Sequence, residues 1–225
     1  MIEHSWDITP RQAIALQQAL SQKVRVCPLA RPVRTIAGVV CAFVGKDKII
    51  AAAVLLDART LEIIARSDTT RACTFPYVPG LLSFREAPAI LDVLGNLAKT
   101  SAAPDLLMID GQGLAHPRGL GIASHVALLS GLPTIGVAKS RLCGEHRDPS
   151  WRRGCCTRLM LQGRQVGVVL RTRDNVKPLY VSIGGQITLE ECIEWTLRCA
   201  TSARLPEPTR RAHQYVSWLK ARVQP

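Results

Sequence analysis

The sequence predicts an α/β protein with a mixed sheet flanked by helices, in one domain over residues 1–225. Three strand-like stretches, 35–44, 48–56 and 61–72, are separated by turns short enough for antiparallel hairpins. Strand and helix patterns alternate after them, which is typical of parallel strands joined by helices. Hydrophobic residues make up 47% of the chain, which is enough for a packed core. Antiparallel hairpins followed by parallel strands that helices connect therefore favour a mixed sheet.

Each expected element depends on a local pattern. Thr9 and Pro10 form an N-cap and first-turn pair, so we expect a helix over 11–24. Thr188 and Glu191 form a capping box that opens a helix to about residue 201. The other expected elements, in chain order, are a linker at 25–33, a rigid loop at 74–80, a helix at 83–99, a strand at 105–110, a helix at 119–129, a strand at 133–138, an irregular region at 144–165, strands at 165–170 and 178–183, and a terminal helix at 207–222.

The stretch 106–142 carries the strongest functional signal. Its apolar run 106–109 ends in Asp110 and Gly111. In open α/β sheets, ligands bind outside the carboxyl ends of the strands, where this carboxylate would lie. The element order also matches the ribonuclease H-like arrangement, in which carboxylates from neighbouring strands meet at one sheet edge. Two interpretations of Asp110 stay open: a Mg²⁺ ligand or a turn aspartate before glycine.

The net charge of +12 at pH 7 and the pI near 9.8 indicate an anionic partner, with nucleic acid as the first candidate. The alternative is a merely solubilising surface. Arginine outnumbers lysine, which suits planar contacts to phosphate. The arginines expected to make such contacts are Arg152, Arg153, Arg158, Arg171, Arg173, Arg210 and Arg211.

The eight cysteines form no C-x-x-C pair, so we do not expect a zinc ribbon. The N-terminus lacks the basic stretch and apolar core of a signal peptide. No apolar run reaches about 18 residues, the length of a membrane span. We therefore expect a reduced, cytoplasmic, monomeric protein that does not associate with membranes.

Two further residues have open interpretations. Pro76 and Pro79 bracket Tyr77 and stiffen its loop. A ring held in this way could wedge between bases while a nucleotide is displaced, and the alternative is a surface tyrosine packed on its own loop. Glu86 ends an S-x-x-E pattern that is typical of a capping box. The alternative for Glu86 is a second carboxylate beside Asp110.

Lys139 follows an apolar strand and would emerge at the same sheet edge as Asp110 if the two strands are parallel neighbours. It would then neutralise a scissile phosphate, and the alternative is an ordinary solvated lysine. His116 either orients substrate or bonds a loop carbonyl. His125 is expected to be a hydrogen-bonded helix histidine, and the role of His213 stays open.

Together these segments closely resemble endonuclease V, a family of repair nucleases with a ribonuclease H-like fold. The resemblance runs from about Ile36 to about Arg211. The length and order of the motifs distinguish it from a chance match. The matching stretches are Pro76–Glu86, Asp110–Gly113 continuing through His116–Arg118, Gly121–His125, Pro133–Lys139 and Leu205–Arg210.

The resemblance implies a Mg²⁺-dependent endonuclease, with Mn²⁺ as a substitute. It would recognise deoxyinosine, the product of adenine deamination, and cut the second phosphodiester bond 3′ to the lesion. Asp110 and Glu86 would be the metal-site carboxylates, and Lys139 would face the phosphate. His213 would stand near the metal, and Tyr77 would be the wedge. The residues implied around the displaced base are Pro79, Gly80, Leu82, Gly111, Gly113, His116 and Gly121.

The sequence departs from the family pattern at two positions. The first strand of the family reads Ile-Ala-Gly-x-Asp, with the aspartate as a central metal ligand, and Val40 stands at that place here. Valine offers no donor, and Cys41 points to the other face of a regular strand. Asp47 and Asp57 lie in expected turns, out of reach. Gln112 replaces a common histidine and can still form hydrogen bonds.

Three hypotheses follow. The main one is a lesion-directed endonuclease acting on DNA that contains deoxyinosine. The second is a binding protein with the same groove and wedge but an impaired metal site. Val40 favours this hypothesis, and the retained site residues oppose it, namely Glu86, Asp110, Lys139 and His213. The third is a nuclease that prefers inosine in RNA, since contacts to a 2′-hydroxyl leave no clear motif. The nuclease hypotheses require Asp110 and Glu86 to converge beside the Tyr77 loop.

Overall fold

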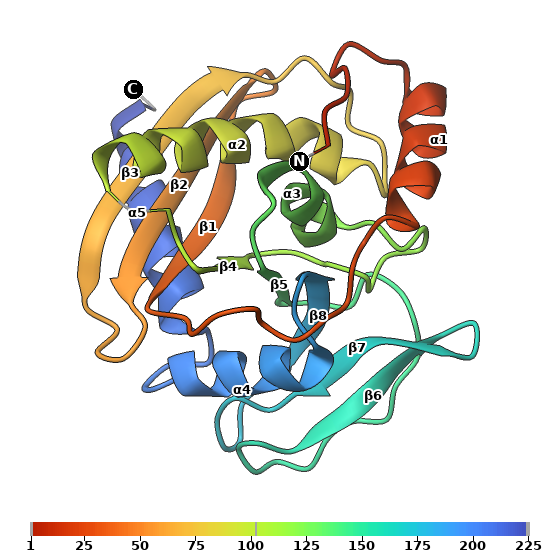
Figure 1. The fold of residues 1–225 in the computed structure, drawn as a ribbon, viewed down its shortest axis with the longest axis vertical. Helices are drawn as coiled ribbons and strands as arrows, with labels where there is room; N and C mark the ends of the chain where they lie inside the picture. The colour runs from red at the N-terminus through yellow and green to blue at the C-terminus, as the bar shows by residue number, and fades with distance from the viewer. Residues whose placement is uncertain (1, 102, 224–225) are drawn as a thin grey trace.

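A computed structural model describes residues 2–101 and 103–223 (Figure 1). No helix within these ranges is long and apolar enough to span a membrane. The elements are α1 (Pro10–Ser21), β1 (Thr35–Val44), β2 (Lys48–Asp57), β3 (Ile63–Ala72), α2 (Leu82–Thr100), β4 (Leu106–Ile109), α3 (Ile122–Ser130), β5 (Thr134–Ala138), β6 (Cys156–Leu161), β7 (Arg164–Leu170), β8 (Leu179–Gly185), α4 (Leu189–Cys199) and α5 (Glu207–Val223).

The strands form one mixed sheet in the order β3-β2-β1-β4-β5-β8-β7-β6. The first three strands are antiparallel neighbours. β4 lies between β1 and β5 and is parallel to both. β8, β7 and β6 continue the sheet with antiparallel pairings. The predicted α/β fold, with antiparallel strands followed by parallel ones in a ribonuclease H-like order, is therefore confirmed.

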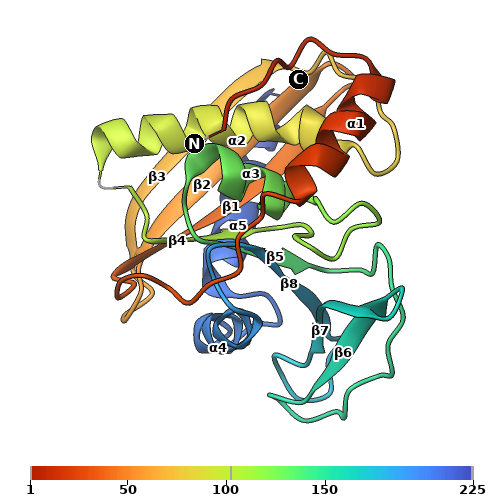
Figure 2. The same ribbon diagram turned by 45° about the vertical axis from the view of Figure 1, so that its right-hand side comes forward.

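Helices cover both faces of the sheet (Figures 1 and 2). α2 and α3 lie on one face, and α5 lies on the other. Side chains alternate between the faces along β1, because successive residues of a strand point to opposite sides. Ala37 and Val39 pack in the cluster under α2. Ile36 and Val40 pack in the opposite cluster together with Ala212 of α5.

The region 144–165 is irregular, as the sequence suggested, only up to Cys155, because it then contains β6 and the turn into β7. Gln162 (φ 51°) and Gly163 (φ 76°) form a two-residue connection between the paired residues Leu161 and Arg164. Two positive φ angles match the twist of an antiparallel hairpin. The prediction was wrong beyond Cys155 because Gln-Gly was not recognised as a turn of the Asn-Gly kind.

Capping explains where two helices begin. Thr188 Oγ1 accepts from Glu191 N at 3.2 Å, and Glu191 Oε2 accepts from Thr188 N at 2.9 Å, which confirms the predicted capping box. α3 begins at Ile122 rather than at 119, because Gly119 has a positive φ of 68° and Gly121 is an extended N-cap. The chain between β4 and α3 is therefore a loop, and this loop forms part of the site.

Candidate active site

A cavity of about 470 Å³ lies at the carboxyl ends of β4 and β5, beside β1. Its walls come from the loop before α2, the first turns of α2, the loop after β4, the start of α3 and the segment after β5. It gathers most of the residues predicted for the site. The predicted residues that line it are Tyr77, Pro79, Gly80, Leu82, Glu86, Asp110, Gly111, His116, Gly121 and Lys139.

Asp110 and Lys139 meet because β4 and β5 are parallel neighbours. Ile109 is in register with Gly136, so both side chains emerge at one edge of the sheet. Lys139 Nζ donates to Asp110 Oδ2 at 2.5 Å, and the carboxylate side chain is 19% exposed. Within the described part of the chain, this is the one hydrogen bond that the Asp110 side chain receives. Asp110 is therefore an acid paired with a cation, not an acceptor for the amides of a turn.

Glu86 lines the same cavity from α2. The capping-box interpretation is wrong: the N-cap is Leu81, which has no side-chain cap, and Ser83 Oγ instead bonds His125 Nδ1 at 3.1 Å. Loss of hydration disfavours a buried carboxylate, and a second negative charge disfavours it further. The pKa of Glu86 is raised from 4.5 to about 8, mainly because the side chain is buried and to a smaller extent because of the negative charge of Asp110. Glu86 therefore holds its proton at pH 7 in the free protein.

Replacing Glu86 by glutamine is expected to flatten the pH dependence of stability. Because its folded-state pKa is raised, the native state holds the proton more tightly than the unfolded chain does. That stabilisation is complete below pH 4.5 and is lost as pH rises through about 8. The free energy of unfolding of the unmodified protein should fall relative to Glu86→Gln by up to roughly 1.4 kcal/mol per pH unit across this window.

The measurement is urea unfolding at several pH values in the presence of a chelator. Glu62→Gln is the matched control, since Glu62 is exposed on the surface. Its profile should run parallel to that of the unmodified protein. Parallel profiles for Glu86→Gln as well would show that Glu86 titrates normally.

The residue beside Asp110 on β1 is Val40. Val39 pairs with Ile109, and the N–H group of Asp110 donates to the carbonyl of Val39 at 3.2 Å, so Val40 and Asp110 are the next pair along the two strands. Val40 is 4% exposed and packs in the apolar cluster on the α5 side. Cys41, on the opposite face, lines the cavity instead. Burial, followed by the nearby carboxylates, raises the pKa of the Cys41 thiol well above its ordinary value.

The Tyr77 side chain stands at the cavity and is 73% exposed. Its loop is anchored on both sides, because Phe75 and Leu81 are buried in one cluster with Phe84. The N–H group of Leu81 donates to the carbonyl of Val78 at 3.0 Å. This exposure places the ring on the surface, as both interpretations require, and leaves little of the side chain packed on its own loop. The loop therefore presents an aromatic ring to solvent from a fixed base.

His116 is buried, and both of its ring nitrogens have a partner. Nε2 donates to the carbonyl of Gly80 at 3.1 Å, and Nδ1 accepts from Arg118 N at 3.1 Å. The carbonyl can only accept and the backbone N–H can only donate, so the partners define the tautomer. Burial, with the charge of Arg118 second, lowers the pKa of His116 to about 4. The loop-carbonyl interpretation is confirmed.

Two predicted residues are not in the lining of the cavity. The N–H group of Gly113 donates to Ser182 Oγ at 2.9 Å, and a Cβ at this position would lie 2.0 Å from the carbonyl oxygen of Ile183. Gly113 therefore serves the close packing of its loop on β8. His213 lies exposed on α5, across the sheet from α2. His125 is a fully buried, hydrogen-bonded helix histidine, as predicted.

Most of the arginines predicted to contact phosphate already have partners inside the protein. Arg171 is 2% exposed and donates to the carbonyls of Ser150 and Pro149. Arg153 and Arg173 donate to carbonyl groups at and after the end of α4. Arg210 and Arg211 form ion pairs with Glu207. The fold, rather than a phosphate, explains these five positions.

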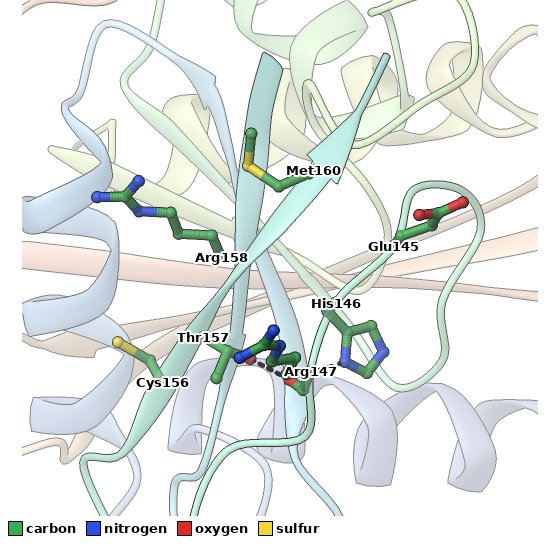
Figure 3. Close-up of a pocket in the computed structure, with 7 residues that line it drawn as sticks. All are labelled: Glu145, His146, Arg147, Cys156, Thr157, Arg158 and Met160. Atoms are coloured by element: carbon green, nitrogen blue, oxygen red, sulfur yellow. Dashed lines mark hydrogen bonds between the residues drawn. The ribbon is translucent and has the colours of Figure 1, made fainter. Parts of the chain in front are cut away.

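Arg152 and Arg158 of the same set are exposed. Arg158 borders a second hollow on β6, which shares no lining residue with the Asp110 cavity (Figure 3). The hollow lies between β6 and the segment that precedes it, and no acidic pair of the predicted site contributes to it. Its lining is Glu145, His146, Arg147, Cys156, Thr157, Arg158 and Met160.

Several residues of the main cavity were not predicted as site residues from the sequence. Ser140, Arg141 and Leu142 line it directly after Lys139, and their position beyond the same strand end was the available signal. Gln112 also lines it and is 7% exposed. Its Nε2 donates to the carbonyl of Ser140 at 3.0 Å, which joins the loops that follow β4 and β5.

The fold and the cavity define an α/β protein that gathers an acid and a lysine from the ends of its central strands and a second acid from α2. The family model for endonuclease V matches residues 18–214. This chain belongs to the endonuclease V family.

Individual relatives agree with this assignment. Endonuclease V of Gloeobacter violaceus is 45% identical over 226 residues, which span 99% of this chain and 91% of the relative. The crystal structure of endonuclease V from Streptomyces avermitilis has a TM-score of 0.90 at 38% identity, covering 100% of this chain and 98% of that one. Endonuclease V of Ciona intestinalis, solved in complex with a 24mer DNA containing an inosine followed by a ribo-adenosine, has a TM-score of 0.83 over 95% and 98% of the chains. At 21% identity this last likeness shows a shared fold.

Proposed function

We propose that this protein is a metal-dependent endonuclease that recognises deoxyinosine in DNA and hydrolyses the second phosphodiester bond 3′ to it. The observation that carries the proposal is the single cavity that Asp110, Glu86 and Lys139 share with the Tyr77 loop. Membership of the endonuclease V family supports nuclease chemistry. The inosine-containing DNA bound to the Ciona relative supports the choice of lesion.

Lesion recognition would begin with displacement of the base. Extrusion of a nucleotide costs a few kcal/mol of stacking and pairing, and least for a mispaired base. The exposed ring of Tyr77 is placed to fill the gap in the stack, and its anchored loop loses little conformational freedom on binding. The adjoining cavity would receive the displaced base. Inosine would therefore be selected partly by the ease of its extrusion.

Asp110 and Glu86 fit a divalent cation such as Mg²⁺ or Mn²⁺. Mg²⁺ is commonly held by one or two carboxylates together with water and substrate phosphates. The repulsion between the two acids contributes to the raised pKa of Glu86, and a cation would relieve it. No group of three or more His, Cys, Asp or Glu side chains in ranges 2–101 and 103–223 is arranged to hold a metal. Phosphate and water oxygens would therefore supply the remaining ligands.

In the proposed reaction, each side chain of the cavity has a separate role. A bound cation supplies polarisation of the phosphoryl oxygens and of an attacking water. Lys139 Nζ, bonded to Asp110 in the free protein, would donate to a phosphate oxygen. Glu86 would release its proton before serving as an anionic ligand. His116 is neutral with both nitrogens engaged, so it holds its loop and transfers no proton.

Two alternatives have specific support. A binding protein with an impaired metal site is favoured by Val40, which places an apolar side chain beside Asp110. A preference for RNA is favoured by the ribo-adenosine after the inosine in the complex of the Ciona relative. Both alternatives use the same cavity, so cleavage assays separate them from the main proposal.

The test is incubation of the unmodified protein with end-labelled 30-base-pair duplexes that differ only in one inosine or adenosine. Each duplex is tested with Mg²⁺, with Mn²⁺ and with a chelator, and the product is mapped on a sequencing gel. We expect one nick, at the second bond 3′ to inosine, only with metal present. Tight binding to the inosine duplex without a nick would establish the binding protein. The same assay is run on an RNA strand of the same sequence with one inosine, and faster cutting of this RNA than of the DNA would establish the RNA nuclease.

A further inference from the structure

The carbonyl oxygen of Gly80 is the point at which distant parts of the chain meet. Gln17 Nε2 lies 3.1 Å from it, His116 Nε2 lies 3.1 Å from it, and Arg118 Nη2 lies 2.7 Å from it. A carbonyl oxygen has two lone pairs, so three donors share an acceptor that usually serves two. Gly80 follows Pro79 and ends the loop that presents Tyr77. The end of this loop is therefore tied both to α1 and to the loop before α3.

Gln17 is the centre of this arrangement and is fully buried. Its Nε2 also donates to the carbonyl of Leu120 at 2.7 Å, and its Oε1 accepts from Arg118 Nε at 2.5 Å. A buried amide is costly unless it is hydrogen-bonded. Here both ends of the amide are engaged, and every bond goes to a segment that borders the cavity. Gln17 itself is not part of the lining.

The backbone conformation favours glycine at position 80, and the absence of a side chain leaves room there for Arg118. The φ of Gly80 is +79°, a conformation that residues with a Cβ rarely adopt. A Cβ would also lie 2.6 Å from Arg118 Nη2, where the guanidinium approaches the backbone. Arg118 thus approaches the backbone closely at Gly80, and its Nε donates to Gln17 Oε1, which helps to fix the orientation of the same guanidinium.

We propose that Gln17 is a positioning residue for base displacement. It holds the Tyr77 loop and the His116–Leu120 segment at a fixed separation, so the cavity between them exists before DNA arrives. This inference rests on the proposed function, because it assigns a task to the wedge and cavity described there. A preformed cavity lowers the entropy lost on binding, and this gain applies to the displaced base and not to contacts with undamaged DNA.

The test compares Gln17→Met with Gln18→Met. Methionine keeps the length of glutamine but has no amide, and Gln18 is the exposed neighbour of Gln17 on α1. The first readout is amide hydrogen exchange in residues 77–82. We expect exchange there to rise about tenfold in Gln17→Met, with no change in residues 90–97 of α2. Gln18→Met should match the unmodified protein in both segments.

The second readout is fluorescence of 2-aminopurine placed next to inosine in a duplex, recorded at saturating protein. Gln17→Met should lose most of the increase that accompanies base displacement. Its kcat/KM should fall about tenfold on this duplex and less on a single strand, which has no partner base to lose. Its affinity for an undamaged duplex should stay within about twofold of Gln18→Met.

A double-mutant cycle with Arg118→Met tests the shared acceptor. Both side chains act on Gly80, so the double variant should be little worse than the more severe single variant. Fully additive losses would overturn the shared role.

Equal amide exchange and equal fluorescence in the Gln17 and Gln18 variants would overturn the inference. A general loss of exchange protection, together with weaker binding to all DNA, would also overturn it. If the unmodified protein gives no response to inosine, the proposed function fails, whereas the exchange comparison still decides whether Gln17 fixes the loop.

Discussion

Replacing Asp110 by asparagine is expected to lower the cleavage rate of an inosine duplex by about a thousandfold. Asparagine keeps the shape of the side chain but removes the negative charge that pairs with Lys139 at 2.5 Å. A divalent cation would then keep only Glu86 as an acidic ligand in the cavity. The measurement is single-turnover cleavage at saturating protein and metal, so that weaker binding of DNA does not enter the rate.

Asp92→Asn is the matched control for this variant. Asp92 is an exposed acid of α2 that pairs with Arg71 at 2.8 Å, and surface pairs of this kind contribute little to stability. Its cleavage rate should stay within about twofold of the unmodified protein. Thermal unfolding of both variants checks that each is folded at the assay temperature. If Asp110→Asn cuts as fast as the control, the cavity is not the catalytic site.

Replacing Val40 by aspartate is expected to destabilise the metal-free protein and to strengthen metal binding. The new carboxylate would enter an apolar cluster that leaves Val40 4% exposed. An uncompensated buried charge costs roughly 3 kcal/mol of stability. The same carboxylate would lie beside Asp110 in the parallel pair of β1 and β4, where a cation can join them. The Mg²⁺ concentration for half-maximal cleavage should fall about tenfold, equivalent to about 1.4 kcal/mol.

Val40→Asn separates the two effects, because asparagine places a polar side chain in the same cluster without a charge. We expect Val40→Asn to be destabilised, with or without Mg²⁺, and to gain no metal affinity. Thermal unfolding with and without Mg²⁺ gives the stability change, and a Mg²⁺ titration of cleavage gives the affinity. Cleavage by Val40→Asp alone, with none by the unmodified protein, would reject the proposal that the natural chain is an active nuclease.

Local patterns determined much of the fold. The turns between the first three strands and the alternation that follows are encoded within a few residues each, and they predict the mixed sheet that the structure contains. The strand ends at Asp110 and Lys139 were predictable for the same reason. Parallel strands place their carboxyl ends at one edge, so two side chains that follow neighbouring strands come together.

Other features depended on packing between segments far apart in the sequence. The S-x-x-E pattern around Glu86 looks like a cap, yet Ser83 turns to His125 and Glu86 is buried near Asp110. The arginines look like phosphate ligands, yet several of their side chains donate hydrogen bonds to carbonyl groups inside the protein. Arg171 is an example, at 2% exposed.

The sequence by itself determined the order of strands and helices apart from β6, the acid and the lysine at the strand ends, and the stiff loop around Tyr77. The tertiary structure alone decided which side chains are buried away from water and which of them hydrogen-bond to the same acceptor. The raised pKa of Glu86 and the joining of Gln17 to Gly80 both arise between residues that are distant along the chain. Burial and hydrogen bonds between distant segments depend on the neighbours in space, and no local pattern of residues specifies them.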